Sequence, residues 1–237
     1  MTQSASNTNN LINIITAPKL AFPAIKEKPS VLFPLGLILA AAICSMVYFY
    51  ATVDFAWMIE QMVNAQTVGK SDAEREGMQK AMGMMSPTIM GGSSVAGMVI
   101  AISIFYSIMA AYLMLVNKLL DSDNLGFKAW FSFICWCSIP SIFTSLASLI
   151  NIMLASNGQI TPEALNPISF NNLFLHLVPS DPLFGPLSPW DPMMLWGMGL
   201  MIFGFNQWTG KSLAKSAAIV LAPSLIIYGT WIAIALN

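Results

Sequence analysis

One stretch of the chain, Lys128–Leu154, constrains the fold more than any other. After Lys128 it contains no charged residue. As an α-helix it would measure roughly 39 Å at 1.5 Å per residue, more than the hydrocarbon core of a bilayer, about 30 Å. Pro140 lies near its middle, where it would break a helix in water. In a membrane, neighbouring helices and hydroxyl side chains such as Ser138 and Ser141 can bond the backbone groups that proline leaves free.

The composition extends this interpretation to the whole chain. Hydrophobic residues make up 56% and charged residues 9%, against about 25% charged in soluble domains. The sequence predicts an all-α integral membrane bundle of five transmembrane helices, with a short N-terminal amphipathic segment and a proline-rich outer cap. We divide it into a cytoplasmic N-terminal segment, 1–30, and a membrane domain, 31–237. The predicted spans cover about 31–53, 95–116, 129–154, 193–208 and 217–236.

The residues before the first span differ from the rest of the chain. Residues 1–10 are polar and lack the apolar core of a secretory signal peptide. From Leu11 on, apolar residues alternate with lysines and prolines, which indicates an amphipathic segment on the membrane surface with lysines toward anionic head groups. An unstructured tether is the alternative, mainly for residues 1–10.

The segments between the spans carry local signals. Ser71 followed by Glu74 is typical of a capping box, so a short helix should begin there. Residues 91–94, Gly-Gly-Ser-Ser, predict a break before the second span. Beyond that break, small residues recur at the four-residue spacing that lets membrane helices approach closely: Ser93, Gly97 and Ala101.

The segment after the third span, residues 155–192, has no lysine or arginine and contains seven prolines. Such density excludes a long regular helix and favours a compact cap of turns and short helices. Its apolar residues predict that the cap is ordered against the outer ends of the spans.

The distribution of lysine and arginine predicts the orientation. With the N-terminus inside, the inner segments hold seven lysines: Lys19, Lys26, Lys28, Lys118, Lys128, Lys211 and Lys215. The outer segments hold only Lys70, Arg75 and Lys80. Because short inner loops are enriched in lysine and arginine, we predict a cytoplasmic (inner) membrane protein with its N-terminus inside and its C-terminus outside.

The chain also contains an internal similarity, a Lys-to-Pro spacing that occurs twice. Lys128 precedes Pro140 by twelve residues, and Lys211 precedes Pro223 by the same twelve. Two parallel hairpin repeats behind an added first span would explain it. Chance similarity between two apolar helices is the alternative explanation.

Candidate chemistry is sparse. The predicted spans lack ionisable residues, which argues against a proton- or sodium-coupled transporter. The single histidine, His176, has only Asp181 and Asp191 as nearby carboxylates, too few partners for a catalytic or metal site, and the cysteines lie inside apolar spans. Methionines gather in the first outer loop, where they favour an adaptable apolar surface, with Cu(I) binding as the alternative. We predict no catalytic residue, no cofactor and no metal ligand.

Several short motifs resemble a known family. In chain order they are Pro18 with Phe22, then Pro29, Pro140, Asn166-Pro167, Asp191 with Trp196, and Pro223. Their order and spacing resemble bacterial members of the Yip family, five-span proteins named for Ypt/Rab-interacting membrane proteins of eukaryotes. Two features depart from the family: residues 133–137 lack its Gly-Tyr pair, and the N-terminal region lacks the eukaryotic acidic-Leu-x-Gly-Pro motif. The second departure puts small-GTPase binding in doubt.

Two functions of different classes follow. The first is a non-enzymatic membrane protein that organises protein partners or lipids, a trafficking-like or scaffold role by resemblance. The second is a passive channel or uncoupled carrier for a small neutral or lipid-like molecule. The expected partners are membrane lipids, other membrane proteins or further copies of the chain. A net charge of −1 gives no basic footprint for nucleic acid.

Overall fold

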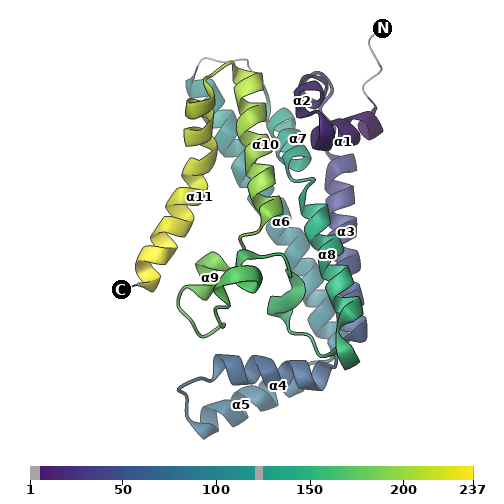
Figure 1. Ribbon diagram of the computed structural model, residues 1–237, viewed down its shortest axis with the longest axis vertical. Coiled ribbons are helices and arrows are strands. Elements are labelled where there is room, and N and C mark those ends of the chain that lie inside the picture. Colours follow the sequence, from purple (N-terminus) through teal and green to yellow (C-terminus); the bar gives the residue numbers. More distant parts are fainter. Residues whose placement is uncertain (1–5, 121–124, 237) are drawn as a thin grey trace. The chain divides into compact units, whose positions relative to one another are not determined.

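The computed structural model describes residues 6–120 and 125–236, which form helices joined by turns and contain no strand (Figure 1). The all-α prediction is therefore confirmed for this part of the chain. The α-helices are α1 (Asn7–Thr16), α2 (Pro18–Glu27), α3 (Leu32–Thr52), α4 (Phe55–Gln66), α5 (Asp72–Gly83), α6 (Pro87–Leu119), α7 (Phe127–Cys137), α8 (Ser141–Leu154), α9 (Phe184–Leu187), α10 (Pro192–Thr209) and α11 (Leu213–Ala235). Shorter turns of helix are η1 (Ser156–Gly158), η2 (Pro162–Leu165) and η3 (Asn171–Leu175).

Three helices, α3, α6 and α11, are long and apolar enough to cross a membrane. The predicted third span is a bent pair, α7 and α8, with 40° between the two helices, and it makes a fourth candidate if the pair counts as one span. Helix α10 has 18 residues and is not among the candidates. The described residues thus give three or four spans by length and composition, and the count of five stays a prediction.

The second span begins earlier than expected, because α6 runs through residues 91–94. The predicted break at the Gly-Gly pair is wrong. Gly91 instead allows a close helix contact: a Cβ there would lie 2.9 Å from the ring of Tyr50 in α3. The Tyr50 hydroxyl is 3.0 Å from the Ser94 hydroxyl. A glycine next to a packed ring serves helix association in a membrane, whereas in water it would favour a break.

The small-residue spacing farther along α6 makes no such contact. Ser93, Gly97 and Ala101 are all exposed, and a Cβ added to Gly97 would meet nothing within 4 Å. Within the described chain, the close approach of α6 therefore runs through Gly91 and not through this stripe.

The helices fall into two compact units, each with its own core. The first comprises residues 1–40, 99–142 and 193–230, and its core is rich in aromatic side chains. Among the largest fully buried side chains in it are Phe22, Trp130, Phe133, Trp136 and Phe205. Trp208 joins them, with its ring centroid 4.8 Å from that of Phe133.

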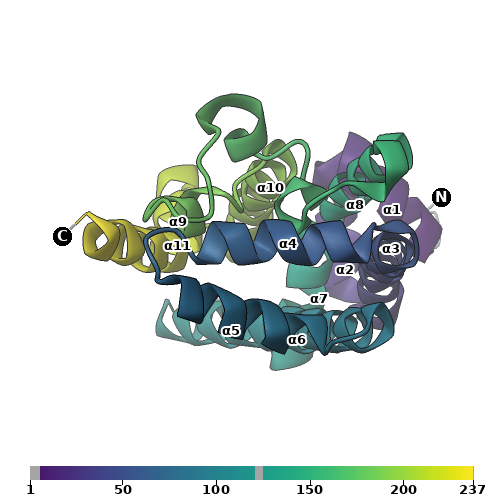
Figure 2. The same cartoon turned by 90° about the horizontal axis from the view of Figure 1, so that it is seen from below.

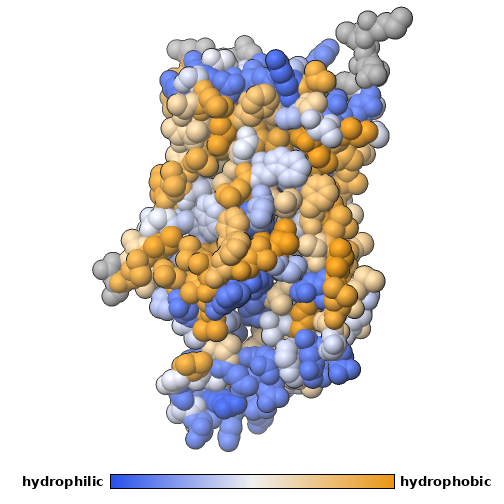
Figure 3. Space-filling model, viewed as in Figure 1, coloured by the Kyte–Doolittle hydropathy of each residue, from blue (hydrophilic) through white to orange (hydrophobic). Residues whose placement is uncertain are grey.

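The second unit comprises residues 41–98, 143–192 and 231–237. In it α4 and α5 lie side by side as a hairpin (Figure 2), and hydrophilic residues gather over that hairpin (Figure 3). The predicted capping box is confirmed, since Glu74 N–H donates to Ser71 Oγ and Ser71 N–H donates to Glu74 Oε2. The Ser71 N–H and the Ser71 hydroxyl both donate to the Glu74 carboxylate, and these two bonds hold its pKa below the ordinary value.

Methionines of the α4–α5 region build part of the core of the second unit. Met58 is fully buried, and four others pack against the same core: Met62, Met78, Met82 and Met90. Met84 and Met85 are exposed. Five of the seven methionines in this loop therefore pack in a core, where the sequence predicted an adaptable apolar surface.

The N-terminal segment forms two helices, so the tether alternative is wrong for residues 7–27. Both helices are amphipathic, as predicted, but their apolar faces pack on protein. Ile14, Phe22 and Ile25 are completely buried in the core of the first unit, and α2 packs against α7. The short helices η1, η2, η3 and α9 between residues 155 and 192 agree with the predicted turns and short helices of the proline-rich segment.

Candidate functional site: helix contacts at the motif residues

Proline inside a helix leaves one carbonyl without its usual partner, the N–H four residues later. Pro223 lies inside α11, so the carbonyl of Ile219 is left without this N–H. The hydroxyl of Tyr112 in α6 donates to that carbonyl oxygen at 2.9 Å. A side chain of a neighbouring helix thus replaces the hydrogen bond that the proline removes.

The same device holds α2 to α10. Pro23 inside α2 frees the carbonyl of Lys19, and the Gln207 side-chain amide donates to it at 3.0 Å. The indole N–H of Trp208 donates to the Phe22 carbonyl at 2.9 Å. In return, the Lys26 ammonium donates to the Trp208 carbonyl at 2.9 Å, at the C-terminal end of α10. Three hydrogen bonds therefore join α2 to the C-terminal end of α10.

These links surround a tightly packed aromatic contact. The Phe22 ring lies 5.6 Å from the Phe133 ring, measured between centroids. Gly204 of α10 faces both rings, and a Cβ at this position would overlap them. Phe22, a residue of the family motif, is thus the apolar anchor of α2, and Gly204 makes room for it.

Lysines also stabilise helix C-termini, whose carbonyls carry partial negative charge. Besides Lys26 on α10, the Lys211 ammonium donates to the Leu120 carbonyl, just beyond α6, at 3.2 Å. Lys26 and Lys211, two of the lysines on which the predicted orientation rests, therefore also form hydrogen bonds with helix ends of the first unit. The five other lysines of that set, Lys19, Lys28, Lys118, Lys128 and Lys215, are exposed.

At Pro140 the predicted third span is interrupted between α7 and α8. The Trp136 carbonyl, freed by Pro140, accepts the Ile139 N–H at 3.3 Å, and the Ser141 N–H donates to Ser138 O at 3.0 Å. The Ser138 hydroxyl donates to the Ile134 carbonyl at 2.9 Å. That carbonyl also accepts the Ser138 N–H, so it is not the group freed by Pro140 that the sequence had predicted as the partner of this hydroxyl.

The break also meets a neighbouring helix closely. A Cβ added to Gly197 of α10 would lie 3.0 Å from the Cys137 carbonyl oxygen. Any side chain at this position would therefore press on the backbone where the α7–α8 pair bends.

Two motifs far apart in sequence meet in the second unit. The Asn166 amide donates to Asp191 Oδ2 at 2.8 Å, and the Thr144 hydroxyl donates to the same oxygen at 3.2 Å. Asp191 is buried and directly precedes α10. The positive end of the helix dipole stabilises a carboxylate at this position. Asn166 and Asp191 therefore anchor the proline-rich segment to the start of α10 and to α8.

The remaining motif residues lie at a helix start, in connecting segments or against a core. Pro18 is the first residue of α2, where proline costs no hydrogen bond. Pro29 lies between α2 and α3, and Pro167 follows Asn166 directly. Trp196 packs against the core of the first unit. His176 is exposed at a turn with positive φ, and Asp181 and Asp191 were its only candidate partners in the sequence.

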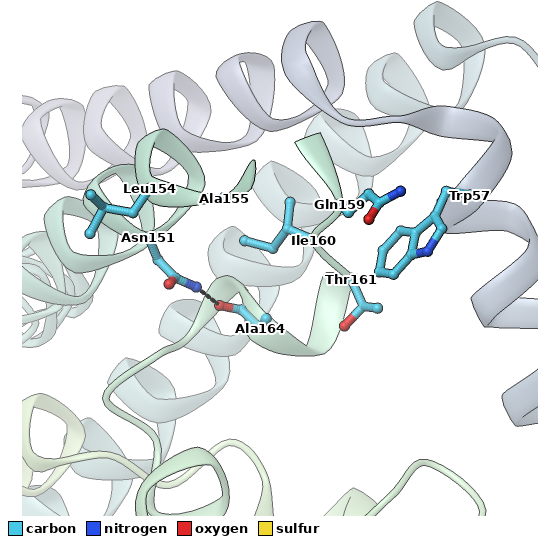
Figure 4. A pocket seen from close by; sticks show the side chains of 8 residues that line it. All are labelled: Trp57, Asn151, Leu154, Ala155, Gln159, Ile160, Thr161 and Ala164. Carbon is cyan, nitrogen blue, oxygen red and sulfur yellow. Dashed lines mark hydrogen bonds between the residues drawn. The ribbon is translucent and has the colours of Figure 1, made fainter. Parts of the chain in front are cut away.

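A small pocket in the second unit, about 360 Å³, lies beside Trp57 of α4 (Figure 4). One of the residues that line it, Asn151, donates from its side-chain amide to the Ala164 carbonyl at 2.8 Å. This bond joins α8 to η2.

Several contact residues were missed from the sequence. Tyr112, Gly204 and Gly197 carry no motif, and their role depends on which residue faces them. For Tyr112 the available signal was a phenol inside an apolar span, which must find a partner in lipid. The proline at 223 was recognised, but the partner of the carbonyl that it frees was not.

The long apolar helices are those of a multi-pass integral membrane protein. The Yip1 domain matches residues 12–234, and the chain belongs to that family. The chain is also 22% identical over 228 residues to membrane protein YknW of Bacillus subtilis, covering 95% of this chain and 90% of the relative. No solved structure matches it.

Proposed function

We propose that this Yip1-domain protein is a non-enzymatic scaffold that organises protein partners or lipids in the cytoplasmic membrane. The observation that carries the proposal is the Tyr112–Ile219 hydrogen bond at 2.9 Å. A conduit built on Pro223 would need the freed carbonyl as a lining group. Here the carbonyl serves to join two helices, which is what a rigid platform requires.

The contacts at the other prolines support the same function. Ser138 bonds its own helix at the Pro140 break, and Gly197 of α10 packs against that break. In α2 the carbonyl freed by Pro23 binds Gln207. Polar groups near the prolines are thus used for packing, whereas a channel or uncoupled carrier would direct them into a water-filled path.

Cysteine accessibility separates the scaffold from a conduit. Single cysteines would replace Ser141 or Ser224 in a chain lacking Cys44, Cys135 and Cys137. A membrane-impermeant thiol reagent should leave both sites unmodified. Lys80→Cys on the exposed face of α5 serves as the positive control. Labelling of both serine positions at the rate of the control would contradict the proposed scaffold function and favour a channel or uncoupled carrier.

We further propose that the N-terminus lies inside and the C-terminus outside. Lys26 and Lys211 support this, because they bind the C-terminal ends of α10 and α6 in the first unit, the side on which short loops hold lysine. A reporter after Asn237 should read outside, and one near Asp121 should read inside; both positions lie beyond the described residues. The same side for both would refute the orientation.

The partners can be identified by capture from native membranes with lipids retained, reporting bound proteins and lipids together. A scaffold should retain at least one protein or one lipid class at constant ratio through gel filtration. Recovery of the chain alone, in a folded state, would contradict the proposed role.

A further inference from the structure

A second pocket, of about 570 Å³, lies in the first unit where helices begin. It is lined by Asn7, the segment Pro29–Phe33 and Lys128. Asn7 is the first residue of α1, Leu32 is the first residue of α3, and Lys128 is the second residue of α7. The pocket thus collects the N-terminal ends of three helices.

The chemistry of the lining suits an anion. Lys128 is its one charged residue, and no carboxylate lines the pocket. The helix ends add partial positive charge, and the N-terminus of α7 has no side-chain cap. The Ser30 hydroxyl donates to Asn7 Oδ1 at 2.9 Å, which leaves the Asn7 amide nitrogen as a further donor.

The other half of the lining is apolar: Leu32 faces outward, and Val31 and Phe33 also pack against the core of the first unit. Val31, Leu32 and Phe33 line the pocket, and Leu32 is 86% exposed. Leu32 also begins α3, one of the candidate membrane spans. A ligand in this pocket would have its polar end among the helix N-termini and its apolar part along α3.

We propose that this pocket binds the phosphate-containing head group of an anionic phospholipid, whose acyl chains follow α3. The phosphate lies between Lys128 and the α7 N-terminus, and the Asn7 amide donates to a head-group oxygen. A free phosphate shares the polar half of this chemistry but makes no use of Leu32. The pocket is separate from the helix contacts that carry the proposed scaffold function, so each can fail without the other.

The test uses the purified full-length chain in neutral detergent, titrated with phosphatidylglycerol or phosphatidylcholine and read by native mass spectrometry. The wild type should prefer phosphatidylglycerol. Lys128→Gln should weaken its binding about fivefold, the effect of one lysine near an anionic surface. Lys128→Arg should retain binding. Lys215→Gln, which removes an exposed lysine at the start of α11 in the same unit, is the matched control and should change binding less than twofold.

Three outcomes would overturn the proposal. Equal binding of the two lipids would show that the pocket does not select an anion. Equal losses for Lys128→Gln and Lys215→Gln would show that surface charge acts without a pocket. Displacement of phosphatidylglycerol by inorganic phosphate at equal concentration would show that the site takes a soluble anion and not a lipid. Unchanged helical circular dichroism and monodispersity would confirm that each variant is folded.

Discussion

Two prolines that the sequence places in equivalent positions, Pro140 and Pro223, have different consequences. Helix α11 continues through Pro223 from Leu213 to Ala235. At Pro140 the chain breaks into α7 and α8, with 40° between them. Both prolines follow a lysine by twelve residues. Proline alone therefore does not decide whether a membrane helix breaks, and the group that bonds the freed carbonyl differs between the two sites.

The surroundings explain the difference. At Pro223 a hydroxyl from α6 takes the place of the missing N–H, and α11 continues as one helix. At Pro140 the chain tightens, so that Ile139 N–H and Ser141 N–H bond carbonyls three residues back. Gly197 of α10 then packs against the Cys137 carbonyl. If the two hairpins are repeats, they have diverged at this point.

The largest effect should come from filling the space beside the break. Gly197→Val would force a branched side chain against the Cys137 backbone carbonyl, which cannot rotate away. Overpacking of this kind costs about 1–3 kcal/mol. Thermal unfolding in detergent should show a marked loss of stability.

The control for Gly197→Val lies two residues away. A Cβ on Gly199 would meet nothing within 4 Å, and the residue is exposed. Gly199→Val should therefore leave the unfolding temperature nearly unchanged. Equal losses for both variants would mean that the valine acts on α10 itself and that the contact with the break is unimportant.

A smaller effect is expected at the continuous helix. Tyr112→Phe removes the hydroxyl that bonds Ile219 and leaves its carbonyl unsatisfied in an apolar setting. The expected loss of unfolding free energy is about 1 kcal/mol. Tyr48→Phe in α3 is a control, because that tyrosine is exposed. A loss of zero for Tyr112→Phe would mean that the hydroxyl does not support the helix at Pro223.

Much of the architecture could be predicted from the sequence, because its signals are local. Charge-free apolar runs predicted α3 and α11 to within a few residues, and Ser71 with Glu74 predicted the start of α5. The failures involve contacts between distant residues. Gly91 packs against the ring of Tyr50, about forty residues earlier in the chain, and one partner of Asp191 is Asn166, 25 residues away. No local pattern specifies either pair.

The third prediction asks what holds the bend at Pro140. Pro140→Ala supplies an N–H, but Trp136 O already accepts Ile139 N–H, and Gly197 packs against the adjacent carbonyl. We expect the break to remain and stability to change by less than about 1 kcal/mol. Spin labels at 131 and 150, one on each side of the break, should keep the wild-type distance. A longer distance, from a straightened helix, would assign the bend to proline itself.

The smallest effect, and the sharpest comparison, lies at Pro223. Pro223→Ala would give Ile219 O the N–H that an ordinary helix supplies, while Tyr112 still donates to it. Because a carbonyl oxygen has two lone pairs, both bonds can form, and the single variant should gain only a few tenths of a kcal/mol. In this background Tyr112→Phe no longer leaves the carbonyl unsatisfied, so its cost should fall below that in the wild type. A double-mutant cycle measures this coupling directly. Additive effects would show that Tyr112 and Pro223 act independently, and the account of why α11 stays continuous would then be wrong.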